Sequence, residues 1–205
     1  MDGVSEKVRK GRKFDQVLAG ARQVFLDDGF ERASVDAIAR AAGVSKATLY
    51  SYFPDKRHLF TEVTRAECER QASEATASID TTAPAPQVLR AAADHMIRFF
   101  TSRFALRIFR ICLAESDRFP ELGRDFYNSG TRVAEETLVA YIDEAASRGE
   151  LRIEDATLAA HQFIELCKAE LFQKYIFGIQ SEFSEAEKAR IARGAVEMFM
   201  ARYGA

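Results

Sequence analysis

Cysteine is scarce in this sequence, and long apolar runs are missing. The chain has 205 residues and only three cysteines, Cys68, Cys112 and Cys167, with no C-x-x-C pair. An odd number of widely spaced cysteines argues against a disulfide framework and against a zinc site. No run of 18 apolar residues occurs, and charges stand at the start where a signal peptide has its apolar stretch. We therefore expect reduced thiols and a cytoplasmic protein that does not enter a membrane.

Motifs of catalysis are missing as well. The sequence contains no paired carboxylates, no Ser/His/Asp set and no glycine-rich phosphate loop. His58 lies near the start of a predicted helix, which indicates a surface position for it instead of a catalytic base. We expect no enzyme activity, no metal and no cofactor.

The net charge of −2 is unevenly distributed along the chain. Residues 1–60 hold 11 Lys and Arg against 8 Asp and Glu, a net +3, so the remainder carries a net −5. The basic residues are densest in an N-terminal arm, Lys7, Arg9, Lys10, Arg12 and Lys13. Such an arm suits a polyanion, because each neutralised phosphate releases counterions. A disordered, solubilising tail is the alternative.

Helical periodicity dominates the sequence. Apolar residues recur three and four positions apart and no strand-like alternation appears, which predicts an all-α fold of about nine helices. The first helix is expected at 14–28 and should end at Gly29. The others are expected at 35–42, 45–53, 55–79, 87–104, 106–116, 120–147, 154–178 and 184–203. The prolines of TTAPAP, residues 81–86, interrupt the pattern.

Two of the short helices have the spacing of a helix-turn-helix, because only Ala42, Gly43 and Val44 join them. Ser34 and Ser45 are good N-caps, and Gly43 can take the left-handed position between them. The inward positions would be Ile38, Ala39, Val44, Leu49 and Phe53. The outward residues of the second helix are small, hydroxylated or basic, which suits a major groove. Short helices with a glycine turn also occur in proteins that never touch nucleic acid, so the spacing alone leaves that alternative open.

A longer pattern surrounds this motif. From Ala21 to Phe60 the chain reads AxxVFxxxGFExxSVDxIAxxAGVSKATLYxYFPDKxxLF, close to the N-terminus and behind a basic arm. This stretch resembles the tetracycline-repressor (TetR) family of bacterial regulators. The resemblance implies a helix-turn-helix DNA-binding domain over residues 1–60. It implies DNA contacts from Arg12, Lys13, Ser34, Ser45, Lys46, Ala47, Thr48, Tyr50, Ser51, Tyr52 and Lys56.

The same resemblance implies a helical ligand-binding and dimerisation domain over residues 61–205. The segment RGELRIEDATLAAHQFIELCKAELF is similar to a branch of the family with an AefR-like C-terminal region. Candidate ligand residues are His95, Met96, Phe99, Phe100, Cys112, Tyr127, His161 and Cys167. Candidate dimer residues are Phe163, Leu166, Phe177, Val196, Phe199, Met200 and Tyr203. For both sets, ordinary core packing is the alternative.

These features together favour a homodimeric transcriptional regulator, most simply a repressor, on a palindromic double-stranded operator. A small hydrophobic effector bound to the C-terminal domain would release it by shifting the population of two forms. Two alternatives stay open. The C-terminal domain could bind a protein partner in place of an effector, or the chain could be a helical carrier or enzyme with an incidental helix-turn-helix.

Overall fold

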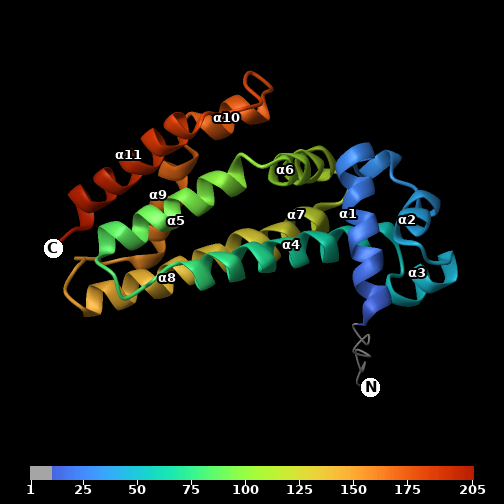
Figure 1. Ribbon diagram of the computed structural model, residues 1–205, viewed down its shortest axis with the longest axis horizontal. Coiled ribbons are helices and arrows are strands. Elements are labelled where there is room, and N and C mark those ends of the chain that lie inside the picture. The colour runs from blue at the N-terminus through green and yellow to red at the C-terminus, as the bar shows by residue number, and fades with distance from the viewer. Residues whose placement is uncertain (1–10) are drawn as a thin grey trace.

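The computed structural model describes residues 11–205, which form an elongated all-helical molecule (Figure 1). Within this range there are eleven α-helices and one π-helical turn, and the only β-type pairing is an isolated bridge between Leu151 and Gly204. The all-α prediction is confirmed. Lys7, Arg9 and Lys10 of the predicted arm lie outside the described residues.

Three helices form a compact unit at one end of the molecule (Figure 1). They are α1 (Arg12–Arg32), α2 (Val35–Ala42) and α3 (Lys46–Tyr52). Gly29 has φ 78° and interrupts α1 where the sequence predicts its end, because glycine adopts this left-handed backbone without a steric penalty. Aromatic side chains pack this unit against the next helix, among them Phe25 and Phe60, whose rings meet edge to face with their centres 5.3 Å apart.

The long helix α4 (Lys56–Ser78) leads from this unit into the rest of the molecule. It begins as predicted at Asp55, whose carboxylate accepts hydrogen bonds from the backbone N–H groups of Arg57 and His58 at 2.8 and 3.0 Å. Its first turns bury Leu59, Phe60 and Val63 in the N-terminal core.

Seven further helices pack along and beyond α4. They are α5 (Ala85–Phe100), α6 (Arg103–Glu115), α7 (Pro120–Phe126), α8 (Arg132–Ser147), α9 (Ala156–Lys168), α10 (Leu171–Ile176) and α11 (Glu185–Tyr203). The C-terminal core contains fully buried side chains of α8, α9 and α11, such as Ile142, Phe163 and Phe199. Helices α6 and α7 instead bury Phe104, Ile108 and Leu122 in the N-terminal core. They therefore connect the two halves of the molecule.

Two predicted helices are interrupted. The helix expected at 120–147 is divided by the π-helical turn η1 (Tyr127–Thr131), where Gly130 lies so close to α4 that a Cβ atom would be 2.8 Å from the Cys68 Sγ atom. The helix expected at 154–178 breaks before Glu170, which has φ 64°. The Glu170 carboxylate is paired with Lys174 and Arg190, so side-chain contacts hold a conformation that a non-glycine residue rarely adopts.

Candidate DNA-binding surface, central cavity and terminal-helix groove

The joint between α2 and α3 is held by the expected caps. The Ser34 Oγ atom accepts the Ala37 N–H at 3.1 Å, and the Ser45 Oγ atom accepts the Thr48 N–H at 3.1 Å. Gly43 has φ 63° and donates its N–H to the Arg40 carbonyl at 3.2 Å. Each short helix therefore has an N-terminal backbone N–H group satisfied by its serine cap, and Gly43 closes the end of the first one.

The inward face of α3 anchors it in the core. Leu49 is 1% exposed and Phe53 only 2%, and the Phe53 ring lies 5.2 Å from that of Phe14 on α1. The predicted inner positions Ile38 and Ala39 of α2 are also buried. Because these buried side chains pack α3 against the core, the direction of its outer face is fixed.

That outer face carries the predicted DNA-contacting residues. Lys46, Ala47, Tyr50 and Ser51 are exposed, and Tyr50 keeps 51% of its surface accessible. Thr48 is half-buried and its hydroxyl lies 2.9 Å from that of Ser45. The other predicted contacts also lie at this end of the molecule. Tyr52 is half-buried with its ring edge-on to Phe14, and Ser34, Arg12 and Lys13 are exposed.

The two lysines of the predicted set have different environments. The Lys46 ammonium lies 2.6 Å from the Asp36 carboxylate, and this hydrogen bond raises the pKa of Lys46. Both side chains are more than half exposed, so a DNA phosphate can compete for the lysine. Lys56 instead donates to the carbonyls of Phe30 and Glu31 at 2.6 and 3.2 Å. Its ammonium also lies 4.5 Å from the Phe30 ring centre, so Lys56 links the start of α4 to the end of α1.

A cavity of about 420 Å³ runs between α4, α5 and α8 and is closed by parts of α6, α9 and α10. Four of the predicted ligand residues line it together: His95, Met96, Phe99 and Phe100, all from α5. The Nε2 atom of His95 lies 2.8 Å from the Ser78 hydroxyl. Burial lowers the pKa of His95 and the nearby Arg98 lowers it further, so the ring is neutral at pH 7.

The other four predicted ligand residues lie elsewhere. Cys112 is buried in the N-terminal core and Cys167 in the C-terminal core. Tyr127 is 47% exposed, and His161 faces outward from α9 with its Nε2 atom 2.5 Å from Glu135. The sequence pattern could not separate these core and surface positions from cavity positions, because all of them follow the same helical spacing.

Helix α4 contributes a wall of the cavity that its sequence did not predict. Its lining residues are Cys68, Gln71, Ala72, Ala75, Thr76 and Ile79, which recur three and four positions apart. Phe109, Phe172 and Lys168 are further lining residues that were not predicted. Burial raises the pKa of all three cysteine thiols to about 12. The Cys68 side chain that lines the cavity is therefore a protonated thiol.

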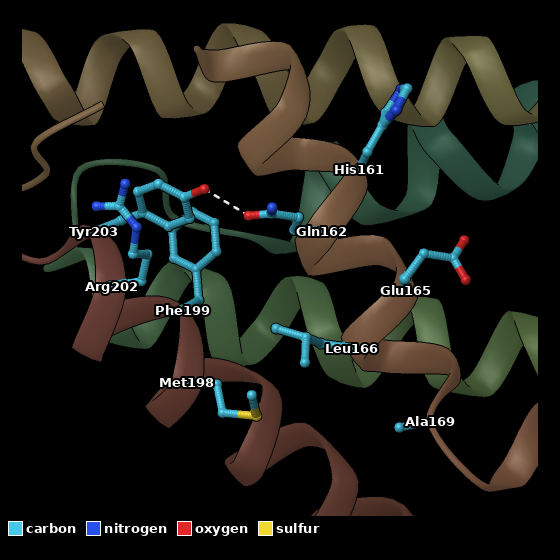
Figure 2. A pocket seen from close by; sticks show the side chains of 9 residues that line it. All are labelled: His161, Gln162, Glu165, Leu166, Ala169, Met198, Phe199, Arg202 and Tyr203. Carbon is cyan, nitrogen blue, oxygen red and sulfur yellow. Dashed lines mark hydrogen bonds between the residues drawn. The ribbon is translucent and has the colours of Figure 1, made fainter. Parts of the chain in front are cut away.

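A second hollow, of about 500 Å³, lies on the outer side of α9 and α11 (Figure 2). We call it the terminal-helix groove, and it is lined by His161, Gln162, Glu165, Leu166, Ala169, Met198, Phe199, Arg202 and Tyr203. The Tyr203 hydroxyl donates to the Gln162 side-chain oxygen at 2.5 Å across it. Met198 of α11, which lines the groove, and Leu158 of α9, which does not, are apolar and at least half exposed.

Three of the predicted dimer residues, Leu166, Phe199 and Tyr203, line this groove, and the other four do not. Phe163, Val196, Phe199 and Tyr203 are at most 9% exposed and belong to the protomer's own core. Leu166 and Met200 are half-buried against that core, and Phe177 is 76% exposed beyond α10. The face of α11 with the most apolar residues therefore packs against α5 and α9 of the same protomer. A second protomer would contact the opposite face, which carries fewer apolar residues.

Two classes of site have no candidate in the described range. Residues 11–205 contain no group of three or more His, Cys, Asp or Glu side chains placed to hold a metal ion. None of the helices described is both long and apolar enough to cross a membrane.

Known proteins resemble this chain in both halves. Residues 17–63 match the bacterial regulatory proteins of the tetR family, and residues 87–205 match the C-terminal domain of AefR-like transcriptional repressors. The HTH-type transcriptional activator FasR of Mycolicibacterium smegmatis is 37% identical over 84 residues, which cover 41% of this chain and 38% of FasR. The chain therefore aligns with less than half the length of this curated relative.

Solved structures match over nearly the full length. A putative TetR-family regulator from Mesorhizobium loti is 27% identical with a TM-score of 0.88, covering 97% of this chain and all of the other. The flavonoid-responsive regulator FrrA is 35% identical with a TM-score of 0.77, covering 95% of this chain and 98% of FrrA. Because the AefR-like match alone spans more than half of the residues, the chain belongs to the TetR family of bacterial transcriptional regulators.

Proposed function

We propose that this protein is a homodimeric repressor that grips a palindromic operator with two copies of α3 and is released by a small molecule in the central cavity. The anchored recognition helix carries the DNA-binding part of the proposal. Its buried face fixes it in the core, while Lys46, Tyr50 and Ser51 remain exposed for base edges and phosphates.

Two substitutions on α3 test this surface. Tyr50→Ala is expected to weaken operator binding about tenfold without changing the melting temperature, since half of the side chain is exposed. Lys46→Ala should weaken binding and lower the slope of log affinity against log salt by about 1, as one phosphate contact is lost. The operator would come from selection of bound DNA from a random pool, and affinity would be measured by fluorescence anisotropy at several salt concentrations.

Lys188→Ala is the matched control for the charge, because it removes a lysine from α11 far from α3. It should bind the operator like the wild type. Equal affinity and salt slope for Tyr50→Ala, Lys46→Ala and wild type would show that α3 does not meet DNA.

Contacts between α6, α7 and the N-terminal unit support coupling of the cavity to DNA binding. Arg57 on α4 pairs with Glu121 on α7 at 2.6 Å, Arg118 pairs with Glu31 at 2.6 Å, and Arg103 pairs with Asp27 at 3.0 Å. Phe126, the last residue of α7, and Gly130 of the following turn η1 both line the cavity. A ligand that displaces this wall would move α7 and, through these pairs, the helices that carry α3.

The cavity itself supports a small molecule as the effector in preference to a protein partner. Its volume falls within the range of drug-sized sites, and its walls are mainly apolar and aromatic with a few polar groups. FrrA, similar over nearly its whole length, is described as flavonoid-responsive. We therefore propose an effector with an apolar, ring-containing or extended body.

The terminal-helix groove is the proposed dimer contact, since its lining includes Met198 of α11, which is 63% exposed, and Leu166 of α9. Wild-type protein at micromolar concentration is expected to have the mass of a dimer by light scattering, and Met198→Asp should shift it to the monomer because a charge would be buried in the contact. Leu113→Asp is the control, because Leu113 is equally exposed, at 62%, but lies on α6. A monomeric wild type, or an unchanged dimer in Met198→Asp, would contradict this contact.

A further inference from the structure

Lys168 occupies an unusual position at the cavity wall. It is the last residue of α9, and its ammonium lies 5.3 Å from the ring centre of Phe100 and 5.8 Å from that of Phe172. Both rings line the cavity. The lysine side chain is only 24% exposed, so its charge lies between aromatic faces and not in open solvent.

The charges around the cavity are few and separated along its length. Among the described residues, Lys168 is the only Lys or Arg in the lining and Glu144 is the only Asp or Glu. Glu144 is held by Arg148 at 2.7 Å, near the end of α8. His95 also lines the cavity, and burial lowers its pKa, which favours the uncharged ring. Within residues 11–205, Lys168 is therefore the one Lys or Arg side chain that a ligand would meet in the cavity lining.

The present partner of Lys168 is weakly held. Glu165 lies 2.6 Å from the ammonium, but within one protomer its own side chain is 70% exposed, and it lines the terminal-helix groove. Ion pairs of such exposed carboxylates contribute little to stability, so exchange of Glu165 for another carboxylate costs little. An acid inside the cavity would gain more, because its pair with Lys168 would be shielded from water by Phe100 and Phe172.

The length of the cavity sets the size of the ligand body. The α4 residues that line it run from Cys68 to Ile79, which corresponds to about 17 Å of helix. Small side chains, Ala72 and Ala75 on α4 and Ala92 on α5, leave the space free. A body of two linked rings or about a dozen methylene groups fits this length.

We infer that the effector is an organic carboxylic acid with an apolar body, and that Lys168 selects it by binding the carboxylate in place of Glu165. This inference rests on the proposed function, because it assigns a chemical class to the effector of the same cavity. An uncharged analogue would fill the same volume and leave the Lys168–Glu165 pair intact.

Matched pairs of probes test the inference on the full chain by titration calorimetry. The acids are dodecanoate and biphenyl-4-carboxylate, and the uncharged partners are dodecan-1-ol and biphenyl-4-carboxamide. Wild type is expected to bind at least one acid about tenfold or more tighter than its partner, the usual worth of a charge-assisted hydrogen bond. Lys168→Met should lose that preference and keep its affinity for the uncharged probe, while Lys168→Arg should retain the preference.

Two further variants sharpen the test. Glu165→Gln removes the competing carboxylate from an exposed position and should raise acid affinity several-fold without changing binding of the uncharged probes. Lys188→Met, on α11 and outside the cavity lining, should behave as wild type. Melting temperatures of all variants establish that each is folded.

The outcomes separate this inference from the function on which it rests. If acids and uncharged partners bind wild type equally, or if Lys168→Met keeps the preference, the inference is overturned and the effector cavity stands. If none of the four probes binds protein that still binds its operator, the cavity fails as an effector site and both proposals are overturned.

Discussion

Alanine at position 20 is expected to disable the DNA-binding unit. Gly20 lies in the middle of α1 where α2 crosses it, and a Cβ atom there would be 2.6 Å from the backbone nitrogen of Ala42 and 2.8 Å from its Cα atom. The contacted atoms are backbone, so no side-chain rotation relieves the overlap. Overpacking of this kind costs about 1–3 kcal/mol, and we expect the upper part of that range.

The effect on DNA binding should exceed the effect on stability. Ala42 ends α2 immediately before the turn that positions α3, so displacing it moves the recognition helix directly. Urea unfolding would give the loss of free energy of unfolding, and anisotropy on the selected operator would give the loss of affinity.

Gly123→Ala provides the matched control for Gly20→Ala. Gly123 is also inside a helix, α7, but a Cβ atom there would meet nothing within 4 Å. Alanine should therefore stabilise the protein by up to about 1 kcal/mol through its higher helix propensity. Similar effects of the two substitutions would refute the close α1–α2 approach.

Tryptophan at position 92 is expected to abolish the response to effector while leaving operator binding intact. Ala92 lines the cavity at the middle of α5 and is half-buried against the C-terminal core. An indole there would occupy space that the ligand needs, so the affinity for the tightest-binding of the four probe compounds should fall by at least about a hundredfold. Calorimetry with that probe and a release assay on operator-bound protein measure the two effects.

The control for Ala92→Trp is Gln87→Trp on the same helix, because Gln87 is exposed and does not line the cavity. It should bind the probe like wild type. If Ala92→Trp retained wild-type affinity for the probe, the ligand would have to bind outside the central cavity.

Local signals in the sequence predicted the DNA-binding unit almost residue by residue. Ser34, Gly43, Ser45 and Asp55 each dictate a helix end through their own side chain or backbone freedom, and all four act as expected. Such caps depend on neighbours within about three residues, so no tertiary information is needed.

Features that depend on distant residues were not predicted. The left-handed Glu170 is held by Arg190, twenty residues away, and Lys56 bonds carbonyls on the far end of α1. The orientation of α11 could not be predicted for the same reason. Its helical period reveals an apolar stripe but does not show whether the same protomer or a partner covers that stripe. Four of the six cavity residues on α5 were found, while the cavity wall on α4 was missed because alanine and threonine carry no strong apolar signal.

The π-helical turn η1 has a consequence for the phase of the helices that it joins. A turn of this kind accommodates one residue more than an α-helical turn, which corresponds to about 100° of rotation around the axis. Before it, α7 directs Glu121 and Asp125 toward Arg57 and Thr61 near the start of α4, and after it α8 directs Leu138 and Tyr141 toward the cavity. Deleting a single residue from η1 would therefore bring the two faces out of step, so that one of them would lose its neighbours while the other kept them.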